Sequence, residues 1–95
     1  MKFEWDNVKE TKNIAKHGID FDMASRIFAD PFRIEFFDNS HSFDEDRYIT
    51  IGEINGEVIL LTVVYTEREE TIRLISARKA TARERRVYHD SRQRD

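Results

Sequence analysis

The run from Val58 to Val64 constrains the fold most, because it is apolar on both faces of any strand that it forms. A strand with two apolar faces belongs in the centre of a sheet. Asn55-Gly56, just before it, is the strongest short signal for a two-residue hairpin, since a type I′ turn needs positive φ at both central residues. We therefore expect a strand at 57–65 that pairs with a strand at 47–54.

The residues after this run continue the sheet. At Tyr65-Thr66-Glu67-Arg68 the central strand ends and a turn follows, with Arg68 at the turn, and 71–78 reads as the next strand. Side chains alternate along a strand, so Arg73 and Arg78 are expected on opposite faces. Three guanidinium groups at the rim of a sheet would suit an anionic ligand, because each offers a fork of donors that matches phosphate. Solvated charges at a sheet edge would give the same pattern.

The N-terminal residues predict a short strand followed by a helix. Phe3 and Trp5 alternate with polar residues, as in a strand with one buried face. Asp6 can cap the helix that follows, because its carboxylate accepts hydrogen bonds from N–H groups that lack partners in the first turn. That helix should run to about His17, where Gly18 supplies a left-handed stop.

A second helix should begin after Asp20, a good cap, and end before Pro31, which lacks a donor and disfavours helix at the preceding residue. Its apolar residues lie on one stripe at helical spacing: Phe21, Ala24, Ile27 and Phe28. We expect this stripe in the core. A half-buried strand should follow, because apolar and charged residues alternate from Phe32 to Phe36.

The last helix should open at Thr81-Ala82-Arg83-Glu84, which has the pattern of a capping box, and run to about Ser91. It offers only Ala82, Val87 and Tyr88 as apolar contacts, so we expect it to pack weakly until a partner covers it. The element order is then β-α-α-β-β-β-β-α. It predicts one α+β domain over residues 1–95, with the later strands in an antiparallel meander.

Composition limits the classes of function. The chain of 95 residues has no Cys, which excludes disulfides, thiolate catalysis and Cys-based zinc sites. No apolar run approaches the roughly 20 residues that span a membrane. The N-terminus lacks the apolar segment of a signal peptide, so we expect a cytoplasmic protein with no membrane contact.

The net charge of −3 argues mildly against a general nucleic-acid binder, but the charges are unevenly placed. Acids gather between Glu35 and Glu57, and bases gather after Arg73. A local basic face can bind a polyanion even when the sum is negative. Opposite patches that neutralise each other in the fold would explain the distribution equally well.

Histidines are the side chains best suited to proton transfer near neutral pH. His17 lies at an expected helix C-terminus, where the dipole favours its charged form, so it could hold a phosphate or simply cap the helix. His41, in an acidic loop, and His89, in the terminal helix, are discounted. A metal site at His41 is a weak alternative. The acids around this histidine are Asp38, Asp44, Glu45 and Asp46, and their spacing lacks the pattern of a calcium loop.

RNA cleavage requires neither a metal ion nor another cofactor. The 2′-hydroxyl beside the scissile phosphate is an internal nucleophile, so an enzyme must deprotonate it, stabilise charge on the phosphate and protonate the 5′-oxygen. Cations, a histidine and a tyrosine can do this if the fold brings them together. The chain offers Arg68, Arg78, His17, Lys9 and Tyr65.

Several segments, in order over nearly the whole chain, resemble the BrnT family of toxins. They are Phe3-Glu4-Trp5-Asp6 with Lys9, then 13–21, 28–31, 47–52, 66–68, 75–80 and Glu84-Arg85. The most specific pair is Lys16-His17-Gly18-Ile19 with Phe21, and Ile75-Ser76-Ala77-Arg78 with Ala80. The resemblance implies a RelE-like fold, with a twisted, mainly antiparallel sheet, two N-terminal helices and one C-terminal helix.

The resemblance also implies a function. BrnT toxins are ribonucleases of type II toxin–antitoxin pairs, which arrest growth by cleaving RNA. The partner would be a BrnA-type antitoxin with a ribbon-helix-helix DNA-binding domain, and the pair would bind operator DNA and repress its own operon. A non-catalytic, toxin-like module that acts only as co-repressor, and a structural partner domain with no nucleic-acid role, are the alternatives.

Site residues follow from the resemblance by position. Arg68 and Arg78 match basic motifs at strand ends and are the first candidates for catalysis. His17 and Lys9 match the N-terminal motif, and Tyr65 is a looser match. Glu84 matches an acidic position of the family, although its place in the capping box explains it as well. Further basic residues are expected to bind RNA: Lys16, Arg73, Lys79 and Arg83.

Overall fold

The computed structural model describes residues 1–54 and 59–93. The elements are β1 (Lys2–Trp5), α1 (Asn7–His17), α2 (Phe21–Ser25), the 3₁₀ helix η1 (Arg26–Ala29), β2 (Ile34–Phe37), β3 (Arg47–Glu53), β4 (Leu60–Arg68), β5 (Thr71–Lys79) and α3 (Ala82–Arg92). The expected α+β class is confirmed, and the observed order differs from the expected one by the added helix η1. The expected Asn55-Gly56 hairpin lies outside the described residues.

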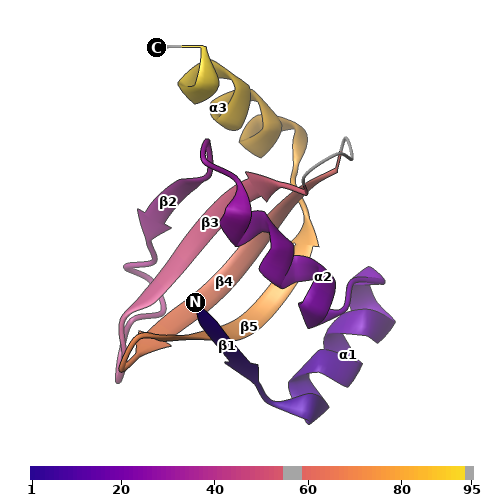
Figure 1. Cartoon of the computed structure of the whole chain (residues 1–95), viewed down its shortest axis with the longest axis vertical. Coiled ribbons are helices and arrows are strands. Elements are labelled where there is room, and N and C mark those ends of the chain that lie inside the picture. Colours follow the sequence, from indigo (N-terminus) through magenta and orange to yellow (C-terminus); the bar gives the residue numbers. More distant parts are fainter. Residues whose placement is uncertain (55–58, 94–95) are drawn as a thin grey trace.

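The five strands form one mixed sheet in the order β1-β5-β4-β3-β2 (Figure 1). β1 pairs with β5 in parallel, and the other three pairs are antiparallel, which confirms the mainly antiparallel sheet and its meander. β4 lies in the centre, as its two apolar faces predict.

The turn between β4 and β5 lies later than expected. β4 continues to Arg68, and Glu69 and Glu70 make the turn with φ of 47° and 71°. Two-residue hairpins need positive φ, which Gly and Asn adopt readily and Glu does not. The sequence therefore carries no turn signal at this point.

Arg73 and Arg78 lie on the same face of the sheet, so the expectation of opposite faces is wrong. Arg73 is opposite Thr66 and Arg78 is opposite Thr62, two residues of the same parity on β4. A register shift at Ile75 inserts one extra residue into β5 between the two arginines. Such a bulge reverses the alternation beyond it, and sequence parity does not reveal it.

One face of the sheet is covered by α2 and η1, which cross it in Figure 1. Phe21, Ala24 and Ile27 are fully buried there against the inner residues of β4 and β5, which confirms the expected core stripe. The α-helix ends at Ser25, however, and the stripe continues on η1. The chain tightens before Pro31, which cannot continue a helix.

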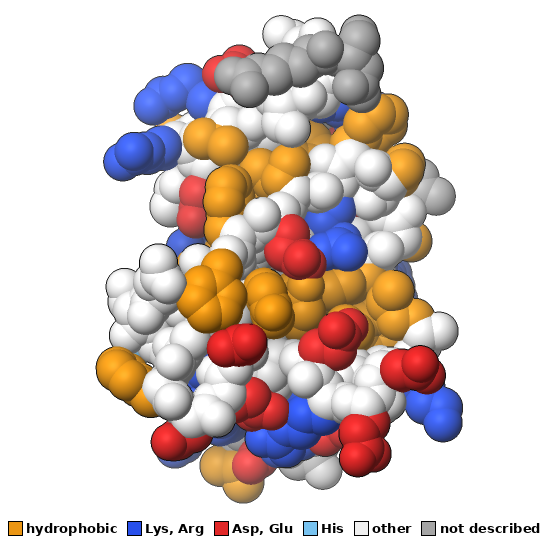
Figure 2. Space-filling model, turned by 90° about the vertical axis from the view of Figure 1, so that its left-hand side faces the viewer, with side chains coloured by type: hydrophobic (Ala, Val, Ile, Leu, Met, Phe, Trp, Pro, Cys, Tyr) orange, Lys and Arg blue, Asp and Glu red, His pale blue; other side chains and the backbone are white. Residues whose placement is uncertain are grey.

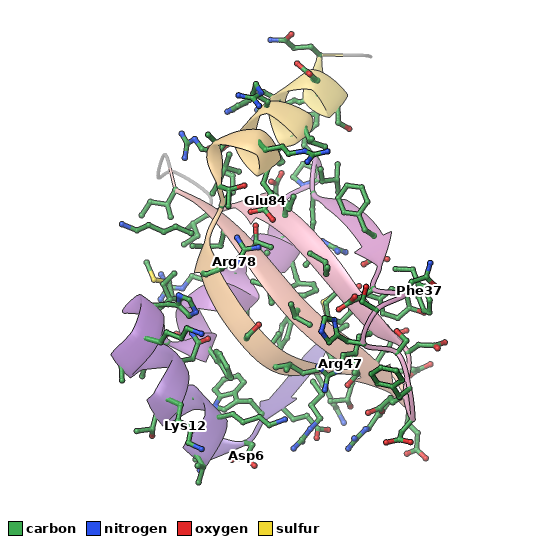
Figure 3. The ribbon with its side chains drawn as sticks, turned by 180° about the vertical axis from the view of Figure 1, so that it is seen from behind. Asp6, Lys12, Phe37, Arg47, Arg78 and Glu84 are labelled. Atoms are coloured by element: carbon green, nitrogen blue, oxygen red, sulfur yellow. The ribbon has the colours of Figure 1, made fainter. Side chains whose placement is uncertain are left out.

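The opposite face, which we call the open face, has no helix across its middle among the described residues (Figure 3). The ladder places Arg47, Ile49 and Ile51 of β3 on it, with Thr62, Val64 and Thr66 of β4 and Arg73, Ser76 and Arg78 of β5. α3 packs over one end, where Tyr88 is fully buried against Ile51 and Leu60. The hydroxyl of Tyr88 donates to Asp30 at 2.6 Å.

α1 is held against β5 by buried Asn13. Its amide nitrogen donates to the carbonyls of Ile19 and Ala77, each at 2.9 Å, and its oxygen accepts from the Ala77 N–H at 3.0 Å. The expected ends of α1 are confirmed, since Asp6 caps it and Gly18 has φ of 70°. These contacts place the lysine-bearing side of α1 beside the open face.

β2 is shorter and more exposed than the alternation from Phe32 to Phe36 predicts. It spans four residues at the edge of the sheet, and Phe36 and Phe37 are 46% and 48% exposed. An edge strand has a neighbour on one side only, so alternation alone does not bury its apolar face.

Candidate active site

A cavity of about 280 Å³ lies on the open face, toward the end away from α3. Strands β3, β4 and β5, helix α1 and the loop before β3 all contribute to it. Its polar lining consists of Lys9, His41, Asp44, Glu45, Arg47, Thr66, Arg68 and Arg73. We call this cavity the basic pocket, because four cations and a histidine face two acids.

Three of these residues form a row across the sheet. Thr66 on β4 is opposite Arg47 on β3 on one side and Arg73 on β5 on the other. Neighbouring strands lie about 4.8 Å apart, so the row places a hydroxyl between two guanidinium stems. In Figure 3, Arg47 lies toward the end of the open face that is remote from α3.

The Thr66 hydroxyl is buried and has no hydrogen-bond partner within 1–54 and 59–93. The residue is 2% exposed and lines the basic pocket. A buried hydroxyl without a partner costs about 1–3 kcal/mol, so such groups are rare without a reason. A ligand oxygen held between Arg47 and Arg73 would supply the missing partner.

His41 reaches the pocket on the loop between β2 and β3. Its Nδ1 is 3.1 Å from Oδ2 of Asp38, whose side chain is largely buried. Ser42 donates to the Asp38 carbonyl at 2.6 Å and accepts from the Arg47 N–H at 2.9 Å, which holds the loop onto β3. A carboxylate at Nδ1 orients the ring and leaves Nε2 for a substrate.

The other two arginines of the pocket are paired. Arg68 holds Glu45 through Nε to Oε2 at 2.5 Å and Nη2 to Oε1 at 2.8 Å. That pairing lowers the pKa of the Glu45 carboxyl and raises the pKa of Arg68. Arg73 Nη1 lies 2.5 Å from Oε2 of Glu4. Arg47 forms no ion pair within the described part of the chain, so its guanidinium is free to meet an anion.

A sequence model described as "Ribonuclease toxin, BrnT, of type II toxin-antitoxin system" matches residues 5–84. The chain belongs to the BrnT family. The match covers α1, the His41 loop and β3 to β5, and so spans every element that builds the basic pocket. BrnT toxins are ribonucleases with an antitoxin partner, as the motifs imply. No curated protein shows significant similarity to the chain.

The BrnT fold gathers part of the expected site. Lys9, Arg68 and Arg73 line the basic pocket. His17 and Lys16 lie in an adjoining shallow cavity of about 240 Å³. The two cavities share Lys9 and Ile75, so the cations of α1 continue the surface of the pocket.

Arg78 and Tyr65 lie apart from the pocket. Arg78 is five residues along β5 from Arg73, roughly 16 Å by strand geometry, and it binds Glu84 instead. Tyr65 faces the covered side, 5% exposed, and its hydroxyl donates to Glu35. Burial raises the pKa of Tyr65. The structure therefore does not bring the five expected catalytic residues together.

Lys79 and Arg83, expected to bind RNA, also lie outside the pocket. Lys79 is exposed at the far end of β5, and Arg83 lines a groove beside α3. His41 is the residue that the sequence argument discounted, because it lies in an acidic loop. The available signal was the spacing Asp38-x-x-His41, which lets a carboxylate meet the ring across one turn.

The weak metal alternative at His41 finds no support in the geometry. Among residues 1–54 and 59–93, no group of three or more His, Asp or Glu side chains is arranged to hold a metal ion. None of the helices in these ranges is long and apolar enough to cross a membrane.

Proposed function

We propose that the basic pocket is the active site of a metal-independent endoribonuclease. The observation that carries this proposal is the row of Arg47, Thr66 and Arg73, with His41 on the loop above it. Two guanidinium groups and a hydroxyl match the oxygens of a phosphodiester. The histidine adds a group that can move a proton.

The proposed reaction uses the RNA as its own nucleophile. His41 Nε2 accepts the proton of the 2′-hydroxyl, and that oxygen forms a bond to phosphorus. Arg47 and Arg73 stabilise the negative charge that develops on the phosphate oxygens. The bond from phosphorus to the 5′-oxygen breaks, and Lys9 supplies a proton to that oxygen. The products are a 2′,3′-cyclic phosphate and a 5′-hydroxyl.

Cleavage of a single-stranded RNA by the purified toxin in EDTA tests this proposal. Arg47→Ala should lower the rate by about 10²–10³-fold, because one preorganised cation is lost from the developing charge. Arg26→Ala is the matched control. Arg26 lies on η1, at the covered face, in an exposed pair with Asp22. If Arg47→Ala and His41→Ala both cleave at the parental rate, the active site lies elsewhere.

The biological role that we propose follows the type II family. The toxin arrests growth in the cytoplasm by degrading RNA, and a BrnA-type antitoxin with a ribbon-helix-helix domain neutralises it. The complex binds operator DNA and represses its own operon. Growth after expression with and without the neighbouring gene, together with a gel shift of the operator by the purified pair, tests each part.

One observation favours a second candidate, a co-repressor without catalysis. Arg68 and Arg73 are already paired with Glu45 and Glu4, and a pocket whose cations are neutralised binds RNA less well. A protein that is harmless when expressed alone, yet raises operator affinity of the antitoxin, would support that role.

A further inference from the structure

A second surface lies where α3 meets the edge of the sheet, away from the basic pocket. Two adjoining cavities of about 450 and 320 Å³ share Phe36 and Val87 and together form one groove between α3 and the strands β2 and β3. We call it the α3 groove. Figure 2 looks onto the β2 side of the molecule and shows hydrophobic side chains gathered on this face.

The floor of the α3 groove is apolar and reaches solvent. Ile34, Phe36, Ile49 and Ile51 line it from the strands, and Val87 lines it from the helix. Phe36 and Val87 are 46% and 40% exposed. Exposed apolar residues that gather in one groove mark a surface that another apolar surface covers.

The groove borders an unpaired strand edge. β2 is the last strand of the sheet, and β3 is its only neighbour among the described strands. An edge strand presents N–H and C=O groups that can pair with an extended segment of another chain. Phe36 projects toward the groove from this edge, so a segment added to β2 would lay its own side chains beside Phe36.

The charges around the groove differ between its two ends. Arg83 lies at one end, and Asp90 lies at the other, beside Glu35, whose carboxylate is already paired with Arg33 at 3.0 Å. Neither Arg83 nor Asp90 forms an ion pair within the residues that the structure describes. The surface therefore complements a peptide that is acidic at one end, apolar in the middle and basic at the other. RNA fits poorly, because its phosphates would meet an apolar floor and the carboxylate of Asp90.

We propose that the α3 groove docks an extended segment of the antitoxin, added as a strand to β2. This inference rests on the type II family assignment, which supplies a protein partner, but not on the assignment of the active site. Ile49 in the groove is two residues from Arg47 in the basic pocket, about 7 Å along β3. A segment that leaves the groove along the open face would therefore cover the pocket.

Binding of the toxin to the protein encoded beside it, purified by co-expression and separated, tests the proposal by calorimetry. Val87→Asp and Phe36→Asp place a charge on the apolar floor and should weaken binding at least 30-fold. Val8→Asp is the matched control, since Val8 is an exposed apolar residue on α1, 63% exposed, and should leave binding within twofold. Both groove variants should retain RNA cleavage and escape inhibition.

Several outcomes would overturn the proposal. Unchanged antitoxin affinity in both groove variants would exclude the groove as the docking site. Loss of RNA affinity with normal antitoxin binding would make the groove an RNA surface, and a dimer that dissociates in Val87→Asp would make it a contact between two copies of the toxin. If a variant misfolds, hydrogen exchange on the wild-type toxin replaces it. The amides of β2 and of the exposed side of α3 must then exchange more slowly in the complex than in the free toxin. If neither the parent toxin nor any variant cleaves RNA, the proposed active site is refuted, but the result on antitoxin binding stands.

Discussion

Arg78 and Glu84 form a bidentate ion pair that joins β5 to the first turn of α3. Nη1 of Arg78 lies 2.7 Å from Oε1 of Glu84, and Nη2 lies 2.9 Å from Oε2. Glu84 also accepts from the Thr62 hydroxyl at 2.9 Å and from the Thr81 N–H at 2.8 Å, which closes the capping box. Figure 3 shows the two labelled side chains together at the α3 end of the sheet. The pair fixes the helix that forms one wall of the α3 groove.

Glu84→Gln should therefore destabilise the protein in a pH-dependent way. Hydrogen bonds from Arg78 lower the pKa of Glu84 to about 2, below its ordinary value of 4.5. A carboxyl with a depressed pKa in the folded state stabilises fully above pH 4.5, and that contribution is lost as pH falls toward 2. After allowance for solvent screening, we expect a loss of about 1–2 kcal/mol at pH 7. Urea unfolding at pH 7 and pH 3 measures it.

The control for this measurement is Asp22→Asn, which removes an exposed ion pair with Arg26 on η1. It should change the free energy of unfolding by less than about 0.5 kcal/mol at either pH. A Glu84→Gln variant as stable as the parent at pH 7 would contradict the role given to the pair.

Arg78→Ala should mainly lower stability, whereas Arg47→Ala should mainly lower the rate of RNA cleavage. Arg78 binds Glu84, so its loss leaves a partly buried carboxylate unpaired and should lower the free energy of unfolding by about 1–3 kcal/mol. Arg47 has no ion-pair partner in the described ranges, so its loss should cost little stability and most of the cleavage rate. Thermal melts and cleavage rates at a temperature where both variants are folded separate the effects. A large, purely catalytic loss in Arg78→Ala would return Arg78 to the active site.

Local rules predicted both ends of α1 and the start of α3, because each depends on one or two nearby residues. Asp6 caps α1, Gly18 ends it and Thr81 with Glu84 forms the capping box, all as expected. The turn at Glu69-Glu70 carried no such signal, since neither residue favours positive φ.

The candidate site was only partly predictable, because its composition depends on register and on loop packing. The bulge at Ile75 brings Arg73 and Arg78 to one face, yet the two arginines remain five positions apart along β5. His41 reaches the pocket because Asp38 and Ser42 hold the loop against β3. The bulge leaves no mark in the residue spacing. The spacing of Asp38 and His41 could suggest that the two side chains meet, but not that their loop folds onto the pocket.

Thr66→Val should lower RNA cleavage without loss of stability. The Thr66 hydroxyl is buried without a partner in the described structure, so its replacement by a methyl group removes an unsatisfied group and should leave stability equal or higher. If the hydroxyl donates to the phosphate, the rate should fall about 5–20-fold, which corresponds to a loss of about 1–1.8 kcal/mol of transition-state stabilisation. Cleavage rates and urea unfolding of the same preparation test both statements.

Thr50→Val is the matched control for this substitution. Thr50 is also fully buried on the sheet, but its hydroxyl donates to the Ile34 carbonyl at 2.8 Å and accepts from Arg33 at 3.0 Å. Its loss should lower the free energy of unfolding by about 1–3 kcal/mol and leave cleavage by the folded protein unchanged. A Thr66→Val variant that cleaves at the parental rate would show that the hydroxyl does not contact the substrate.

Glu45→Gln should strengthen RNA binding, because Glu45 occupies the guanidinium fork of Arg68 inside the basic pocket. With the charge removed, Arg68 is free to pair with a phosphate, and one negative charge leaves the path of a polyanion. We expect about 3–10-fold tighter binding of a single-stranded RNA at low salt.

Each added phosphate contact on a single strand steepens the dependence of log affinity on log salt by about 0.7. Fluorescence anisotropy over a salt series gives both quantities, and Asp22→Asn, which removes the same charge from the covered side of the sheet, should match the parent. Equal affinity and equal salt slope in Glu45→Gln and Asp22→Asn would mean that Arg68 does not contact RNA, and that Arg47 and Arg73 alone hold the phosphate.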